Sequence, residues 1–167
     1  MPVAPNLPLS SKLGLLAAPG SGALLGGALY FQYIVGLPPC EMCHWQRWPH
    51  MVAIAVGLLA LASYAWPRLA LVFMLTAITA LIVTAGIGVF HVGVEYHWWT
   101  GPQACSGNVP RGLSPEQLKK YLFGAKMVRC DETAWAMWGI SMAGWNAILS
   151  AILAAGLASS LSRVARS

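Results

Sequence analysis

Two cysteines, a histidine and an arginine lie close together in the segment Pro38-Pro39-Cys40-Glu41-Met42-Cys43-His44-Trp45-Gln46-Arg47-Trp48. Two cysteines separated by two residues can close a small disulfide, bind a metal ion or anchor a haem. Cys40 to His44 also spells the C-x-x-C-H pattern of covalent haem attachment. Arg47 follows Cys43 by one helical turn, where its positive charge would favour the reactive thiolate. The segment alone therefore leaves three chemistries open.

A second pair of cysteines, Cys105 and Cys130, helps to decide among these three chemistries. Haem attachment needs a second axial ligand and leaves this pair unexplained. A structural zinc site usually combines two short-spaced ligand pairs, whereas Cys105 and Cys130 are far apart in the sequence, so we expect no metal. Thiol–disulfide exchange uses all four cysteines: one pair takes electrons from a protein dithiol, and the other passes them to a membrane-soluble acceptor. The guanidinium of Arg47 can donate a hydrogen bond to the oxygen of a quinone acceptor.

The composition is that of an integral membrane protein. The chain has 167 residues, of which 57% are hydrophobic and only 9% charged, and its mean hydropathy is +0.63. Such a chain is far more apolar than an ordinary soluble domain. The net charge of +5 comes from ten basic residues scattered at the ends of apolar runs, which form no basic face, so nucleic acid is not an expected partner.

We predict an all-α fold, a bundle of four transmembrane helices at about 13–35, 45–66, 69–91 and 139–161. The second apolar run is too short to span the membrane by itself, so the helix must also include residues of the cysteine segment. A cleaved signal peptide is the alternative for the first run, but apolar sequence continues well past a signal core. Gly22 and Gly26 form a GxxxG pair that can admit a neighbouring helix. Loops are expected at about 36–44 and 92–138, a lead at 1–12 and a tail at 162–167.

The long loop contains one further helix signal. Ser114 can cap a helix in which Pro115 takes the first position and Gln117 completes the capping box. Apolar residues after it share one face, as in a short helix that lies on a membrane surface or packs on the bundle.

Alternation of the four helices puts all four cysteines on one side of the membrane and both termini on the other. The positive-inside rule does not assign the sides, since four basic residues fall on the terminal side and six on the cysteine side. Paired thiols suit an oxidising compartment. We therefore expect the cysteines outside the cytoplasm and both termini in the cytoplasm.

The motif Pro39-Cys40-x-x-Cys43-x-x-Gln46-Arg47-Trp48, the four-helix layout and the later Cys105 and Cys130 resemble the DsbB family of bacterial disulfide bond formation proteins. The resemblance implies a quinone reductase that reoxidises a periplasmic DsbA-like thiol oxidase of thioredoxin fold. Its redox centres would be the disulfides Cys40–Cys43 and Cys105–Cys130. The acceptor would be ubiquinone or menaquinone from the membrane pool.

The resemblance also implies individual roles. Cys105 would form the mixed disulfide with the partner oxidase, Cys130 would exchange with Cys40, and Cys43 would face the quinone beside Arg47. The family has a quinone-proximal histidine near the end of its third helix, for which His91 and His97 compete, and we favour His91. His44 departs from the family pattern, and its ring either favours the Cys43 thiolate or packs among the tryptophans.

Two other functions are also consistent with parts of the sequence. A vitamin K epoxide reductase-like enzyme shares the chemistry, but its loop cysteines precede its C-x-x-C motif, whereas here the C-x-x-C comes first. A membrane scaffold stapled by structural disulfides would explain the cysteines but not Arg47. Trp45, Trp48 and the other tryptophans near the cysteines are expected to form an aromatic belt at the membrane interface.

Overall fold

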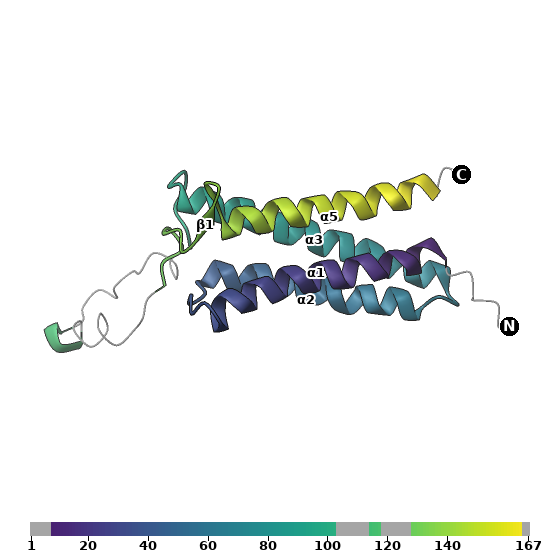
Figure 1. Ribbon diagram of the computed structural model, residues 1–167, viewed down its shortest axis with the longest axis horizontal. Helices are drawn as coiled ribbons and strands as arrows, with labels where there is room; N and C mark the ends of the chain where they lie inside the picture. The colour runs from purple at the N-terminus through teal and green to yellow at the C-terminus, as the bar shows by residue number, and fades with distance from the viewer. Residues whose placement is uncertain (1–7, 103–113, 118–127, 165–167) are drawn as a thin grey trace.

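Four long helices lie side by side in the computed structural model, which describes residues 8–102, 114–117 and 128–164 (Figure 1). They are α1 (Leu9–Tyr33), α2 (Glu41–Ala62), α3 (Pro67–Glu95) and α5 (Met142–Val164). The start of α1 and the end of α5 lie at the same end of the bundle, and the connection from α1 to α2, which contains Cys40, lies at the other (Figure 1). The predicted all-α class is confirmed.

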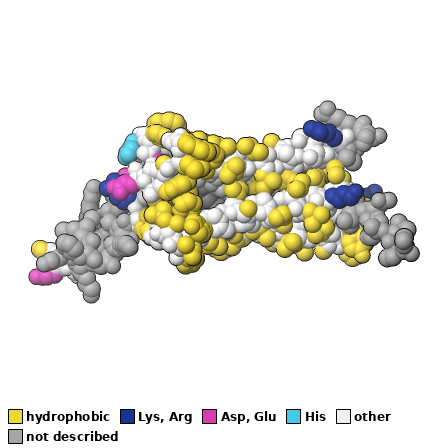
Figure 2. All heavy atoms as spheres, in the orientation of Figure 1, with side chains coloured by type: hydrophobic (Ala, Val, Ile, Leu, Met, Phe, Trp, Pro, Cys, Tyr) yellow, Lys and Arg dark blue, Asp and Glu magenta, His cyan; other side chains and the backbone are white. Residues whose placement is uncertain are grey.

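The surface of the bundle is suited to lipid. Apolar side chains run along its length, and charged side chains gather at its two ends (Figure 2). Within the described residues, three helices are long and apolar enough to cross a membrane: α1, α3 and α5. The first turns of α2 contain Glu41 and Arg47, which lower its apolar character. A fourth transmembrane span therefore stays a prediction.

Helix α2 begins earlier than the expected residue 45. Cys40 is its N-cap, and the Sγ of Cys40 accepts a hydrogen bond from the backbone N–H of Cys43 at 3.2 Å. This contact satisfies one of the amide groups that a helix start leaves without a partner. Pro49 lies inside the helix and does not begin it. Consequently Cys43 and His44 belong to the first turns of a rigid helix and not to a loop.

Helices α1 and α2 approach most closely where two glycines meet. A Cβ atom on Gly14 would collide with the carbonyl oxygen of Gly57, and one on Gly57 would press on the backbone of Ala18. Gly22 and Gly26, the GxxxG pair of the sequence, behave differently: a Cβ on either would meet no atom of the described chain within 4 Å. The close approach of α1 therefore uses Gly14 and not the expected pair.

At the cysteine end, α5 starts at Met142, after the expected residue 139, because a two-stranded hairpin precedes it. Strand β1 (Ala136–Met137) pairs antiparallel with β2 (Ile140–Ser141). The turn between them has positive φ at Trp138 (54°) and Gly139 (78°), the pattern of a tight type I′ hairpin turn. The hairpin brings the chain back from the loop into α5.

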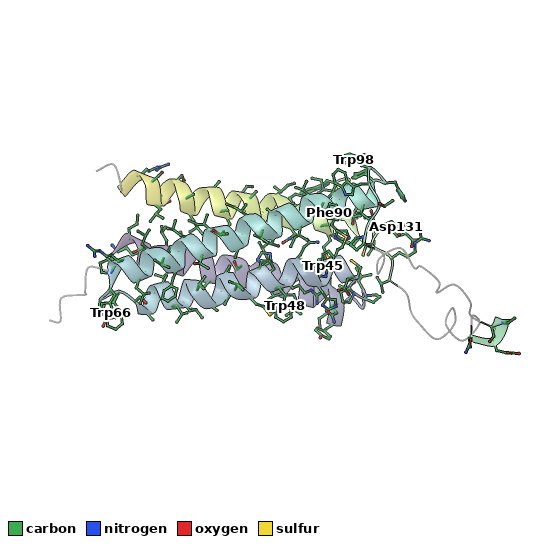
Figure 3. The ribbon with its side chains drawn as sticks, turned by 180° about the vertical axis from the view of Figure 1, so that it is seen from behind. Trp45, Trp48, Trp66, Phe90, Trp98 and Asp131 are labelled. Atoms are coloured by element: carbon green, nitrogen blue, oxygen red, sulfur yellow. The ribbon has the colours of Figure 1, made fainter. Side chains whose placement is uncertain are left out.

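One other expectation for this end agrees with the structure. Ser114 and Gln117 form the predicted capping box. The backbone N–H of Gln117 donates to Ser114 Oγ, and the backbone N–H of Ser114 donates to Gln117 Oε1. The surface helix predicted after it lies outside the described residues. Figure 3 places Trp45 and Trp98 toward the cysteine end and Trp66 at the opposite end; the aromatic belt stays a prediction.

Candidate functional site

Three residues from distant parts of the chain meet at the cysteine end. The Sγ atoms of Cys40 and Cys130 and a ring nitrogen of His91 all lie within 4.8 Å of one another, and all three side chains are buried. Cys43 completes the group, since its Sγ lies 2.8 Å from that of Cys40. Cys40 and Cys43 are free thiols, whereas Cys130 is disulfide-bonded. A thiol pair therefore lies beside a sulfur with which it can exchange.

His91 is held in one orientation between Cys40 and Gln46. Its Nδ1 lies 2.8 Å from Gln46 Nε2, which can only donate a hydrogen bond, so Nδ1 is the acceptor. In the neutral ring the proton is then on Nε2, which lies 3.6 Å from Cys40 Sγ. His91 also hydrogen-bonds the backbone of Cys130, so its N–H group is directed to the junction of Cys40 and Cys130.

Proximity to Cys43 controls the protonation of Cys40. The hydrogen bond between the two thiols, together with burial, raises the pKa of the Cys40 thiol above its ordinary value. When the pair holds a single proton, Cys40 keeps it. Cys40 is therefore a protonated, buried sulfur at neutral pH, and an adjacent donor such as His91 is needed whenever it becomes a thiolate.

A cavity of about 450 Å³ opens beside the cysteines and extends between the helices. Its wall is mostly apolar and is built from all four helices and from the segment that precedes the hairpin. Cys43 and Arg47 from α2 line it, together with His91 and Glu95 from α3 and Trp135 from the loop. A largely apolar cavity with a few polar groups is the usual form of a small-molecule site.

Three buried polar atoms in this cavity have no hydrogen-bond partner within the described residues: Arg47 Nε, His50 Nδ1 and Glu95 Oε2. A buried polar atom without a partner costs free energy, so such atoms usually face a ligand or a water molecule. The guanidinium of Arg47 is anchored on its other side by a hydrogen bond to Gln32 Oε1 of α1. Its Nε–H remains available to a hydrogen-bond acceptor in the cavity.

Three charged residues next to Cys130 pair with one another. Arg129 forms an ion pair with Asp131 and contacts Glu132 at 3.4 Å. The hydrogen bond from Arg129 lowers the pKa of the Asp131 carboxyl below its usual range, so the pair stays ionised at neutral pH. Figure 3 shows Asp131 at the cysteine end of the bundle, where it lines a small pocket together with Trp98.

The predicted site residues fall into three groups. Cys40, Cys43, Cys130, Arg47 and His91 come together as described above. His44 is exposed, and His97 lies in a separate pocket with Trp98 and Asp131; neither is among the described residues that line the main cavity. Cys105 lies outside the described residues.

Several polar residues of the site were missed by sequence reasoning. Gln46, His50 and Asn146 are linked by hydrogen bonds inside the bundle, and Glu95 also lines the cavity. One signal was available for the first two: they follow Cys43 and Arg47 by three residues each, so they share a helical face with the site. Asn146 gave no such signal because it lies in α5.

The geometry favours disulfide exchange over the other two chemistries. Cys40, His91 and Cys130 have the atom types of a zinc site, but a disulfide-bonded sulfur is not the thiolate that a metal requires. For covalent haem, His44 would have to share a space with both cysteines. It is exposed, whereas Cys40 is buried against Cys130 and His91.

Comparisons with known proteins agree with this assignment. The family model described as "Disulfide bond formation protein DsbB" matches residues 10–159. The chain is 30% identical over 161 residues to disulfide bond formation protein B of Polaromonas naphthalenivorans, covering 93% of each chain. It is 32% identical over 152 residues to the protein of that name from Verminephrobacter eiseniae, covering 86% of this chain and 81% of the relative.

A similar protein in Rickettsia prowazekii, itself uncharacterised, is 27% identical over 131 residues, covering 77% of this chain and 74% of the relative. No solved structure gives a significant match. The helical fold, the membrane-capable helices and the cysteine cluster define a membrane oxidoreductase that generates disulfides. The chain belongs to the DsbB family.

Proposed function

We propose that this chain reoxidises a periplasmic thioredoxin-fold dithiol protein of the DsbA type and passes the electrons through two disulfides to ubiquinone or menaquinone. One observation carries the proposal: Cys40 Sγ lies within 4.8 Å of Cys130 Sγ and 2.8 Å from Cys43 Sγ. Cys40 is thus the junction between the two cysteine pairs. Cys43 and Arg47 line the apolar cavity on the other side of that junction.

The exchange proceeds in balanced steps. The partner's dithiol reduces the Cys105–Cys130 disulfide through a mixed disulfide at Cys105 and leaves oxidised. The Cys130 thiolate attacks Cys40 of the Cys40–Cys43 disulfide, which forms a Cys40–Cys130 bond and releases Cys43. Attack of Cys105 on Cys130 restores the loop disulfide and releases Cys40. The Cys40/Cys43 dithiol then holds the two electrons and two protons taken from the partner.

The cavity fits a quinone. Its apolar wall suits the ring and the isoprenoid tail, and the unpaired Nε–H of Arg47 matches a carbonyl oxygen. A bound quinone supplies the oxidant, because it takes up two electrons and two protons as it becomes a quinol. Arg47 would hold the quinone through a hydrogen bond to its oxygen, His91 stabilises negative charge on Cys40, and Glu95 offers a carboxyl group that can carry a proton.

The decisive experiment measures quinone reduction by the purified protein supplied with a reduced DsbA-like partner. The unmodified protein and the exposed-residue control His44→Gln should both reduce the quinone. Cys43→Ser and Cys105→Ser should reduce it at background rates, because each breaks one disulfide. No quinone reduction by the unmodified protein, or equal rates in all four proteins, would contradict the proposal.

The proposed orientation has its own test. In reduced, intact spheroplasts an impermeant thiol reagent should label Cys105 or Cys130, because we place the long loop in the periplasm of the inner membrane and both termini in the cytoplasm. Labelling that requires lysis would reverse this orientation. A disulfide-stapled scaffold, the non-enzymatic alternative, predicts no turnover in the preceding assay.

A further inference from the structure

A chain of buried hydrogen bonds leads from the cysteines to His50 in the middle of the bundle. Cys40 contacts His91, His91 contacts Gln46, and Gln46 Oε1 accepts a hydrogen bond from Asn146 Nδ2 at 2.7 Å. Asn146 Oδ1 lies 2.8 Å from His50 Nε2. These contacts join α2, α3 and α5 at one level of the bundle. Buried polar networks of this kind fix the orientation of their members.

The network determines which nitrogen of His50 carries the proton. Asn146 Nδ2 already donates to Gln46 Oε1 and to Thr84 Oγ1, the latter at 3.1 Å. The amide orientation is therefore set, and Asn146 Oδ1 is left as the acceptor that faces His50. The proton of the neutral His50 ring must lie on Nε2 to satisfy that oxygen. His50 Nδ1 consequently has a lone pair and no proton.

That lone pair has no partner within the described part of the chain. His50 is only 2% exposed, and its Nδ1 is buried and unsatisfied. The residue lines the same cavity as Cys43 and Arg47. Arg47 and His50 are three residues apart on α2, so they lie on one face of the helix about one turn from each other.

We propose that His50 is a second polar contact for the quinone, and that its Nδ1 accepts a hydrogen bond from a hydroxyl of the reduced ring. This inference rests on the proposed function and adds to it a binding preference for quinol over quinone. An acceptor cannot hydrogen-bond the carbonyl oxygen of a quinone, but it can bond the O–H of a quinol. Arg47 Nε–H, in contrast, can donate to an oxygen of either form. His50 therefore favours the reduced product, and Asn146 is the positioning residue that keeps its Nδ1 free of a proton.

The test measures binding and not turnover. In a Cys43→Ser background, which blocks electron transfer, a short-chain benzoquinone and its quinol are bound separately under anaerobic conditions at about pH 8, where an ordinary imidazole is neutral. Equilibrium dialysis gives the two dissociation constants. His50→Phe should weaken quinol binding about three- to tenfold, the usual effect of one lost hydrogen bond, and change quinone binding less than about twofold.

Two further variants make the result specific. His50→Asn places an amide oxygen near the position of Nδ1 and should retain most of the quinol affinity that His50→Phe loses. Asn146→Leu removes the acceptor that fixes the His50 tautomer and should also reduce the preference for quinol. Ser150→Ala is the matched control, because Ser150 Oγ donates to the same Asn146 oxygen at 3.4 Å but is not among the residues that line the cavity.

The outcomes separate this inference from the function on which it rests. Equal losses for quinone and quinol in His50→Phe, or no loss for either, would overturn the role of His50. The unmodified protein would still reduce quinone in that case. If it neither reduces nor binds quinone, the proposed function fails first, and the inference fails with it.

Discussion

Cys40 Sγ lies 3.6 Å from Nε2 of His91, although the two residues are 51 positions apart in the sequence. His91 was expected near the quinone because of the family resemblance. It does line the cavity, but its hydrogen bonds are to Cys40, to Gln46 and to the backbone of Cys130. Its direct effect is thus on the sulfur that connects the two cysteine pairs.

Replacing His91 should slow exchange between Cys40 and Cys130. The N–H of His91 is a donor that can stabilise the Cys40 thiolate, and hydrogen bonds to charged groups contribute about 1.5–3 kcal/mol. In a protein that lacks Cys43 and Cys105, with glutathione disulfide supplied as the oxidant, His91→Phe should lower the rate of Cys40–Cys130 disulfide formation by about tenfold or more. Gel mobility without reductant follows this bond.

The matched control is His44→Phe, which changes an exposed histidine near the start of α2, one residue after Cys43. It should leave the rate of Cys40–Cys130 bond formation unchanged. Equal rates for His91→Phe and the control would show that the contact with Cys40 has no role in exchange.

Arg47→Lys should raise the quinone KM and leave the KM for the partner dithiol unchanged. Lysine keeps the positive charge, but its single nitrogen cannot occupy both the position of Arg47 Nη1, which donates to Gln32, and that of the unpaired Nε. An increase of about tenfold corresponds to roughly 1.4 kcal/mol, within the range for a hydrogen bond from a charged group. Arg68→Lys, at the end of the bundle away from the cysteines, is the control. A parallel rise in both KM values would point to a general disturbance of α2.

The sequence was sufficient for the parts of the site that lie within one helical turn. Cys40, Cys43 and Arg47 are close in the chain, so their spacing predicts their proximity in any helix. Gln46 and Asn146 are 100 residues apart, and their contact exists only because α2 and α5 pack at one level of the bundle. The hairpin before α5 was missed because its turn places Trp138 at a position that usually holds Asn, Asp or Gly.

Stability should depend on Gly14 and Gly57 more than on the GxxxG glycines. Alanine at Gly14 or Gly57 would force α1 and α2 apart, because the added Cβ meets backbone atoms that cannot move aside. Alanine at Gly22 or Gly26 meets open space, so only the higher helix propensity of alanine acts, which stabilises by up to about 1 kcal/mol. Thermal unfolding in detergent should show lower midpoints for the first two variants only. Equal midpoints for all four would contradict the close helix approach.

Alkylation of the reduced protein should modify Cys43 before Cys40, and the difference should depend on pH. The hydrogen bond with Cys43 and burial raise the pKa of Cys40, so Cys40 remains a thiol at pH values where an ordinary cysteine, with a pKa near 9.0, forms thiolate. Only the thiolate is alkylated readily. Burial alone would lower the rate at Cys40 by the same factor at every pH, whereas a raised pKa shifts its pH profile toward alkaline values. Initial rates from peptide mass spectrometry at several pH values distinguish the two causes. A Cys40 profile centred at or below the ordinary cysteine pKa would contradict the assignment of the shared proton to Cys40.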